Sequence, residues 1–252
     1  ISFQRTLTWV LVNIVRCREE PLAIEMVRRM IPVLKSLLIR NDMPVRVDAL
    51  WALTYIADCG NAHIQAIIDG EIVPLVVPML LNQRFRIQIA AIRLLGNVAT
   101  GNDEQTQVLI NHDILTNIRF LLIHNKEQIR RITLWCLYNI TVGTPDQAQA
   151  VFNAGLLPRI ADNLMRFDIR TVKEAVLTIY NLIFAGTMEQ ALDIIDTRAV
   201  HPLFQLMMNE DIQIAKASRE ALKNLFFKAG LLVEKYAQVY EELNVSNNSS
   251  SQ

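Results

Sequence analysis

The sequence predicts an all-α fold that is built from a repeated helical unit. Three observations predict it: tryptophans recur at a constant spacing, glycines and prolines keep nearly the same spacing, and apolar residues follow a helical period. Trp9, Trp51 and Trp135 are separated by 42 and 84 positions, which is one period and two. A period of this length with helical patterning is typical of repeats that stack into a solenoid.

Two registers of residues follow this period. The first register consists of Trp9, Trp51, Arg93, Trp135 and Leu177, and the second, four positions later, consists of Asn13, Tyr55, Asn97, Asn139 and Asn181. A further asparagine, Asn224, is offset by one position. Residues four apart share one face of a helix, so we expect both registers to emerge together along one concave surface.

One unit reads as three helices, over residues 103–113, 114–123 and 126–143. Apolar residues recur at helical spacing through each segment, and no sustained period-two alternation indicates strands. Glycines follow the register segments and prolines introduce the second helices: Gly60, Gly101, Gly143 and Gly186, and Pro32, Pro74 and Pro158. We expect these glycines to act as helix C-caps, and the first helix to close near Asp113.

The pattern predicts a right-handed superhelical solenoid of armadillo repeats over residues 1–228, with three helices in each of about five to six repeats and the first repeat incomplete. A helical extension is expected over residues 229–243. Residues 244–252, NVSNNSSSQ, lack apolar periodicity and are expected to form a disordered tail. The chain opens without a Met and is expected to be part of a longer protein.

The composition argues against several classes of function. Lys and Arg number 25 and Asp and Glu also 25, so nothing global favours nucleic acid or a membrane surface, and no long uncharged span predicts a membrane helix. The three cysteines, Cys17, Cys59 and Cys136, form no CxxC pair, which favours a reducing compartment. The histidines fall outside the third helices and no catalytic or metal-binding motif accompanies them. We therefore expect no enzyme, no cofactor and no metal.

The third-helix segments resemble those of the importin alpha family. The segments are TLTWVLVN, VDALWALTYIADCG, AIRLLGNVATGNDEQTQV, TLWCLYNITVG and EAVLTIYN. The resemblance covers residues 3–228 and corresponds to the family's fourth through ninth repeats. It implies an adaptor that binds the nuclear localisation signals of cargo proteins for import with importin beta, which engages an N-terminal domain absent from this chain. Such an adaptor shuttles between the cytoplasm and the nucleus.

The resemblance also implies which residues bind the basic peptide. Trp9, Asn13, Asp48, Trp51 and Tyr55 resemble the end of the family's major signal-binding site. Arg93, Asn97, Thr106, Trp135, Asn139, Glu174 and Asn181 resemble the minor site and its border. The chain departs from the family where Leu177 replaces a Trp and Ile132 replaces an acid. We expect these two changes to weaken minor-site binding by about 1 to 3 kcal/mol.

These residue types suit an extended basic peptide. An asparagine amide offers both a donor and an acceptor to a peptide backbone that has no secondary structure. Two successive tryptophan rings form a slot for the stem of Lys or Arg and add a cation–π contribution of ~0.5 to 2 kcal/mol each. Asp48 and Glu174 are then placed to neutralise the cationic end. Arg93 should repel lysine locally and separate the two binding stretches.

Simpler roles stay open for several of these residues. A single tryptophan is usually a core residue, although the repeat register favours an open surface here. The asparagines have an alternative role in capping or inter-repeat hydrogen bonds. Asp48 and Glu174 are equally well explained as ordinary surface charges, and Thr106 carries the weakest signal.

The alternative function is a different armadillo scaffold, of the adhesion or signalling kind. Such a scaffold holds acidic peptides in a basic groove, whereas the third helices of this chain supply Trp, Asn and acidic residues. The sequence after Asn224 does not match the final repeat of the importin alpha family. This mismatch puts contact with the family's export receptor in doubt.

Overall fold

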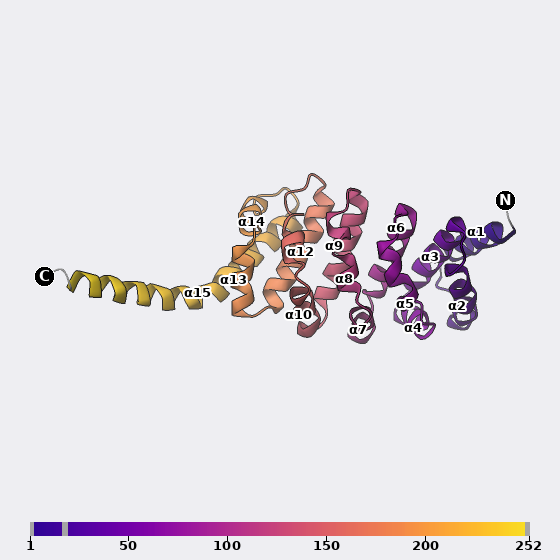
Figure 1. Cartoon of the computed structure of the whole chain (residues 1–252), viewed down its shortest axis with the longest axis horizontal. Coiled ribbons are helices and arrows are strands. Elements are labelled where there is room, and N and C mark those ends of the chain that lie inside the picture. Colours follow the sequence, from indigo (N-terminus) through magenta and orange to yellow (C-terminus); the bar gives the residue numbers. More distant parts are fainter. Residues whose placement is uncertain (1–2, 17–19, 250–252) are drawn as a thin grey trace.

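The computed structural model describes residues 3–16 and 20–249, with side chains described through residue 230. Every regular element in this part of the chain is a helix, as the sequence predicts, and the helices stack into an elongated solenoid (Figure 1). The third helices are α1 (Phe3–Arg16), α3 (Met43–Ala57), α6 (Phe85–Val98), α9 (Glu127–Val142), α12 (Ile169–Ala185) and α15 (Ile212–Ser249). Each of these packs against the next along the chain, so the third helices form one continuous layer.

Shorter helices complete each repeat. The first helices are α4 (Asn61–Asp69), α7 (Asp103–Asn111), α10 (Pro145–Asn153) and α13 (Met188–Asp196). The second helices are α2 (Ile24–Leu38), α5 (Val73–Val76) with η1 (Val77–Leu81), α8 (Ile114–Ile118) with η2 (Leu121–Ile123), α11 (Leu157–Ala161) and α14 (Val200–Leu206). Their apolar faces bury a single continuous core, so each repeat packs its apolar residues against those of its neighbours.

In three repeats a residue in the left-handed region separates the first helix from the second, whereas Thr197, at the same position between α13 and α14, is extended. The three left-handed residues stand 42 positions apart: Glu71 (φ 54), Asp113 (φ 60) and Gly155 (φ 63). The corresponding position in the first repeat is Arg29, which is helical, so α2 runs on without a break. Pro32 therefore lies inside α2, and the expectation that it introduces a second helix is wrong. Pro74 and Pro158 do stand in the first turns of α5 and α11, where their missing N–H groups cost nothing.

The recurring glycines make room for capping glutamines. Three first helices begin with a capping box, formed by Asn102 with Gln105, Thr144 with Gln147, and Thr187 with Gln190. A Cβ atom added to Gly101 or Gly143 would overlap the Oε1 atom of the glutamine that follows. Gly143 and Gly186 are the C-cap residues of α9 and α12, as expected. Gly60 and Gly101 lie two positions beyond the C-cap residues Asp58 and Ala99, so the expectation is wrong at these two positions.

The same glutamines join successive repeats. The Nε2 atom of Gln105 donates to the carbonyl oxygen of Asn61 at 2.9 Å, and that of Gln147 donates to the carbonyl of Asp103 at 2.7 Å. Both glutamines are buried. Because a buried amide without a partner is costly, these contacts favour one relative placement of neighbouring repeats.

The last helix extends further than the sequence predicts. The helical extension expected over residues 229–243 is continuous with α15, and the backbone stays helical over residues 244–249, where we expected disorder. After Gly230 the sequence contains neither Gly nor Pro up to Ser249, so helical hydrogen bonding can propagate. Residues 250–252 lie outside the described residues.

No single helix in the described ranges is long and apolar enough to cross a bilayer. Only a pair of helices joined at a bend of 75°, Asn61–Asp69 and Val73–Leu81, satisfies the length and composition requirements together. Ile64, Ile67 and Leu80 from this pair are buried in the solenoid core. Core packing therefore accounts for the apolar character of this pair.

Candidate functional site

The first register lies along the layer of third helices. Trp9 on α1 is 61% exposed. Trp51 on α3, Trp135 on α9 and Leu177 on α12 are half-buried, with one side resting on the hydrophobic core. None of the four is enclosed between layers, so together they form an accessible surface, which we call the third-helix face.

At the N-terminal end of this face, aromatic rings are the main feature. The ring centroids of Trp51 and Tyr55 lie 6.1 Å apart at an interplanar angle of 31°. Asn13 uses its amide inside α1, because its Nδ2 atom donates to the carbonyl of Trp9 at 2.8 Å and its Oδ1 atom accepts from Arg16 at 2.9 Å. The exposed ring of Trp9 is therefore open to a ligand at this end, and the half-buried Asn13 amide keeps one N–H and one oxygen lone pair.

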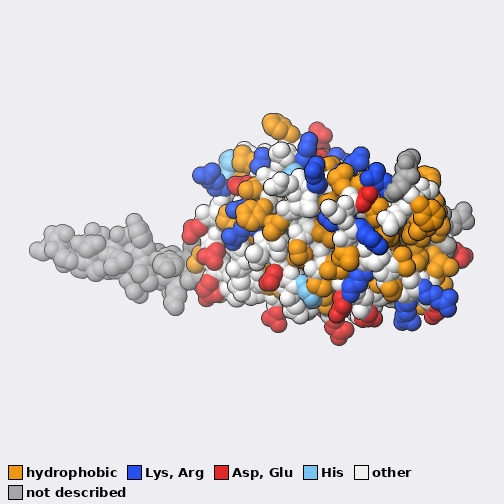
Figure 2. Space-filling view, turned by 45° about the vertical axis from the view of Figure 1, so that its right-hand side comes forward, with side chains coloured by type: hydrophobic (Ala, Val, Ile, Leu, Met, Phe, Trp, Pro, Cys, Tyr) orange, Lys and Arg blue, Asp and Glu red, His pale blue; other side chains and the backbone are white. Residues whose placement is uncertain are grey.

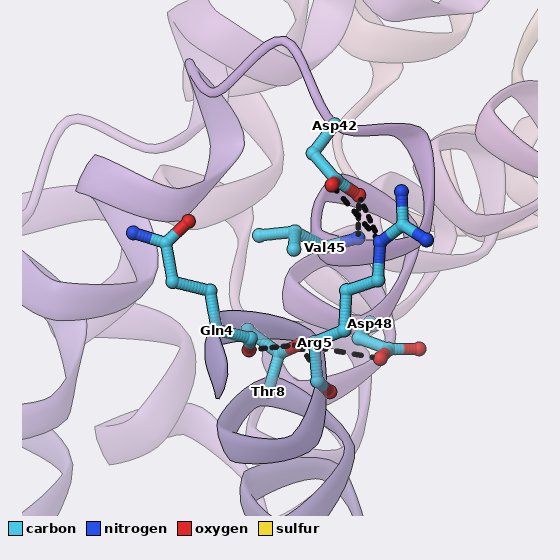
Figure 3. Close-up of polar contacts among 6 residues, drawn as sticks. All are labelled: Gln4, Arg5, Thr8, Asp42, Val45 and Asp48. Atoms are coloured by element: carbon cyan, nitrogen blue, oxygen red, sulfur yellow. Dashed lines mark hydrogen bonds and ion pairs between the residues drawn. The ribbon is translucent and has the colours of Figure 1, made fainter. Parts of the chain in front are cut away.

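Asp48 lies three positions before Trp51, and no described residue forms an ion pair with it. Its Oδ2 atom accepts a hydrogen bond from the hydroxyl of Thr8 at 3.3 Å (Figure 3). Burial raises the pKa of Asp48, and the hydrogen bond from Thr8 lowers that pKa to a smaller extent. The nearby Arg5 pairs with Asp42 instead, with Nε 3.0 Å from Oδ2 (Figure 3). Asp48 is thus a partly desolvated carboxylate that a cation of a bound ligand could pair with.

At the C-terminal end of the face, Trp135 is already covered on one side. The guanidinium carbon of Arg93 lies 4.6 Å from the centroid of the Trp135 ring. A Cβ atom on Gly96 would overlap the same ring, so the glycine provides the space in which the ring lies. We expected Arg93 to border the minor site and to repel lysine, and did not predict this stacking on Trp135, although an Arg one period before a Trp is the signal for it.

The position three residues before the first register is Asp48 on α3, and its counterparts on α9 and α12 have different surroundings. Glu174 on α12 is half-buried, and burial raises its pKa while Lys173 and Arg131 oppose that shift. Ile132, at the corresponding position on α9, is only 6% exposed and belongs to the core. The position where the importin alpha pattern has an acid is therefore a core position in this chain.

Three asparagines of the second register donate to the preceding repeat. The donor–acceptor distances are 2.9 Å from Asn97 to the carbonyl of Thr54, 3.3 Å from Asn139 to the carbonyl of Gly96, and 3.2 Å from Asn181 to the hydroxyl of Thr141. Asn139 and Asn181 stay partly exposed, so each keeps a second amide N–H and an oxygen for a ligand. Asn97 is only 3% exposed, so its amide serves the packing of α6 on α3.

Thr106 is also buried, and it donates to the carbonyl of Ala99 at 3.4 Å. The structure thus places both Thr106 and Asn97 within the repeat interface and leaves little of either side chain on an open surface. The inter-repeat hydrogen bond that the sequence analysis left open as an alternative describes Asn97 best.

Shallow cavities lie beside the second register. A cavity of about 250 Å³ between α6 and α9 is lined by Asn139 and Thr106, and one of about 560 Å³ between α9 and α12 is lined by Asn181. Another of about 250 Å³ lies beside Tyr55 at the N-terminal end. The second register therefore marks a series of recesses between successive third helices.

The described residues offer no group of three or more His, Cys, Asp or Glu side chains that is placed to hold a metal ion. Cys136 is buried, and burial raises the pKa of its thiol to about 12, so the reactive thiolate is not formed near neutral pH. Cys17 lies outside the described residues.

Stacked helical repeats of this period, with adjacent third helices forming one layer, define an armadillo-repeat solenoid. The chain is similar to the designed armadillo repeat protein YIII(Dq)4CqI, with 25% sequence identity and a TM-score of 0.79 over 88% of this chain and 92% of that one. It is also similar to the designed armadillo repeat protein YIII(Dq.V1)4CPAF, solved in complex with the peptide (KR)4. In that case the identity is 26% and the TM-score 0.78, over 88% of this chain and 92% of the other.

A shorter similarity connects the chain to a natural protein. Over 52 residues it is 36% identical to importin subunit alpha-3 from Caenorhabditis elegans. The matched segment makes up 21% of this chain and spans 10% of the length of that relative. A scan against models of known protein families finds no match.

Proposed function

We propose that this chain binds extended Lys- and Arg-rich peptides on its third-helix face and recognises the nuclear localisation signals of cargo proteins as a nuclear import adaptor. The observation that carries the proposal is Asp48, a partly buried carboxylate that has no ion-pair partner among the described residues. A basic side chain whose stem lies against Trp9 and Trp51 can bring its charge to this carboxylate.

Two of the comparisons support this class of ligand. A designed armadillo repeat protein that is 26% identical to this chain was solved in complex with the peptide (KR)4. The segment that is similar to importin subunit alpha-3 connects the chain with nuclear import, and so does the resemblance of its third helices to that family. The adaptor role rests on these two sequence similarities, whereas the binding of basic peptides rests on the geometry around Asp48.

Within this proposal the chain supplies only the part that recognises the signal. Transport together with importin beta, and shuttling between the cytoplasm and the nucleus, belong to this proposal. The proposal does not include the family's export receptor, because the sequence after residue 228 departs from the family pattern. The proposal involves no nucleic acid, membrane or cofactor.

Fluorescence anisotropy with a labelled Lys-rich peptide tests the binding of basic ligands. We expect Trp9→Ala to weaken binding roughly tenfold, because it removes both a stacking surface and a cation–π contact. Met208→Ala is the matched control, since Met208 is 84% exposed and lies outside the third-helix face. Equal binding of a peptide in which Glu replaces every Lys, or an unchanged affinity of Trp9→Ala, contradicts the proposal.

The adaptor role has its own test. Expressed alone in cells, this chain should compete for the signal of a fluorescent reporter that carries a Lys-rich localisation sequence, and so lower the nuclear fraction of the reporter. The Trp9→Ala variant should have a weaker effect. If the peptide binds in vitro while the reporter distribution stays unchanged, the adaptor role is excluded and the binding of basic peptides still stands.

A further inference from the structure

Although the formal net charge of the chain is zero, its basic and acidic side chains are unevenly distributed over the surface. Figure 2 shows Lys and Arg side chains along much of the upper edge of the solenoid, with others at its lower right, and acidic side chains mainly along the lower edge. The upper edge carries the N-terminal ends of α6, α9 and α12 (Figure 1). We define the cationic ridge as six arginines in these segments: Arg84, Arg86, Arg130, Arg131, Arg166 and Arg170.

The acidic side chains of the lower edge have a structural explanation. Asp103 and Glu104 stand in the first turn of α7, Asp146 in that of α10, and Glu189 in that of α13. The N-terminus of a helix carries partial positive charge, so acidic residues in the first turn stabilise it. Their recurrence with the repeat therefore follows from helix stability alone.

The cationic ridge has no such explanation. Arg84 is the N-cap residue of α6, and Arg170 lies in the first turn of α12, where the helix dipole disfavours a cation. Cations stabilise the opposite helix end, yet neither α6, α9 nor α12 has a basic residue in its last turn. The helix dipole favours cations at the C-terminal ends of these helices, so it does not account for arginines at their N-terminal ends.

The arginines of the ridge also repel one another. Burial lowers the pKa of Arg130, and the charge of Arg166 lowers it further. Burial likewise lowers the pKa of Arg131, and Arg170 and Arg93 add to that effect while Glu174 opposes it. Like charges brought this close destabilise the folded chain unless something else compensates them.

The chain itself supplies few compensating partners. Arg170 pairs with Asp168 at 3.2 Å, and Arg130 donates to the carbonyl oxygens of His124 and Asn125. In the part of the chain that the structure describes, no ion pair involves the other four arginines of the ridge, namely Arg84, Arg86, Arg131 and Arg166. The ridge thus presents several guanidinium groups that are free to bind an anionic partner.

From this arrangement we infer that the cationic ridge binds an acidic polypeptide segment of a partner protein, a run of Asp and Glu side chains in extended conformation. The ridge crosses three adjacent third helices, which at a typical spacing of about 8 to 10 Å extend over roughly 16 to 20 Å. An extended chain at about 3.3 Å per residue covers that length with some five to six residues.

A polypeptide fits this edge better than nucleic acid does. The chain has no net positive charge to attract a long polyanion, and Glu127 and Asp168 stand among the arginines. A short acidic segment can place its carboxylates opposite individual guanidinium groups, whereas a continuous phosphate backbone also meets these acids. The site lies outside the first register, so it does not depend on the binding of basic peptides.

The test measures the anisotropy of a labelled peptide of alternating Asp and Glu at low and at physiological salt. We expect Arg86→Gln with Arg166→Gln to weaken binding roughly threefold to tenfold, because both side chains are exposed and make no ion pair within the described ranges. The matched control is Arg28→Gln with Arg29→Gln, which removes the same charge from exposed positions on α2. Raising the salt should weaken the binding of the wild type more than that of the ridge variant.

Three outcomes would overturn the inference: no binding of the acidic peptide, an equal loss in the control variant, or tighter binding of a single-stranded oligonucleotide of the same charge. A thermal melt tests whether the arginines have a structural role instead. Removing cations from helix N-termini should leave the melting temperature unchanged or raise it. A marked fall in the melting temperature of the ridge variant would mean that these arginines stabilise the fold, which also contradicts the inference.

Discussion

The two ends of the third-helix face share one repeat pattern and differ in electrostatics. At the α1–α3 end, Trp9 is open and Asp48 has no cationic partner among the described residues. At the α6–α12 end, Arg93 covers one side of Trp135, and the half-buried Glu174 already has cations nearby. The acidic position three residues before the first register thus has no ion-pair partner at one end and lies near internal cations at the other.

Under the proposed function, this difference predicts that a few side chains set the ligand preference of each part of the solenoid. The third helices recur at both ends, whereas the capping boxes and the hydrogen bonds of Gln105 and Gln147 between repeats begin at α7. The residues that differ are those of the first register and the position three residues before it. Changing them one at a time therefore tests the comparison directly.

The largest expected effect comes from placing an acid at the core position of α9. Ile132→Glu buries a carboxylate without a partner and should lower the free energy of unfolding by about 2 to 4 kcal/mol, as measured by urea denaturation. Leu177→Trp is the control, because Leu177 is half-buried at the edge of the core, and it should change stability by less than about 1 kcal/mol. If Ile132→Glu is as stable as the wild type, then α9 accepts an acid as readily as α3 and α12 do.

The next largest effect separates the two acids. Asp48→Asn should weaken the binding of a Lys-rich peptide about fivefold, because it removes a partly buried carboxylate that forms no ion pair within the described ranges. Glu174→Gln should leave the same affinity unchanged, as measured by anisotropy. Equal losses in both variants would show that the two ends bind basic peptides alike.

A smaller gain is expected from exposing Trp135. Arg93→Ala removes the stacked guanidinium and its repulsion of lysine, so affinity for the Lys-rich peptide should rise roughly twofold to threefold. Arg198→Ala provides a control for the loss of one exposed positive charge. A lower affinity of Arg93→Ala would indicate that Arg93 holds Trp135 in its binding position.

The smallest effect concerns pH. Because burial raises the pKa of Asp48, its uncharged form is favoured in the folded chain, and the stability this contributes at low pH is lost as pH rises through the raised pKa. Near pH 7 the charged form attracts a cation, so affinity for the Lys-rich peptide should fall by less than roughly threefold between pH 7 and pH 5. Asp48→Asn should abolish this dependence and should not lower stability at pH 7. An identical pH dependence in the variant would assign the effect to another group.

The repeat and its third helices are predictable from the sequence, because the Trp and Asn registers and the apolar period all appear in the residues themselves. The all-α solenoid and the closure of the first helix at Asp113 follow the predictions. The space that Gly101 and Gly143 leave for a glutamine side chain is not predictable, since it depends on where the glutamine four positions later folds back.

The candidate site is less predictable, because its properties depend on contacts between residues one period apart. Position in the register does not reveal that Asn97 turns into the interface with α3 or that Arg93 covers Trp135. Nor does it reveal that Ile132 is a core residue whereas Asp48 and Glu174 are half-buried. These outcomes depend on the packing of each third helix against its neighbours.

The most direct test of the account compares Trp51→Ala with Trp135→Ala. Both rings are half-buried against the core, so the two variants control for each other in stability. The account predicts that Trp51→Ala lowers affinity for a Lys-rich peptide about tenfold and that Trp135→Ala lowers it less than twofold, as measured by fluorescence anisotropy. Equal losses, or a larger loss in Trp135→Ala, would contradict it.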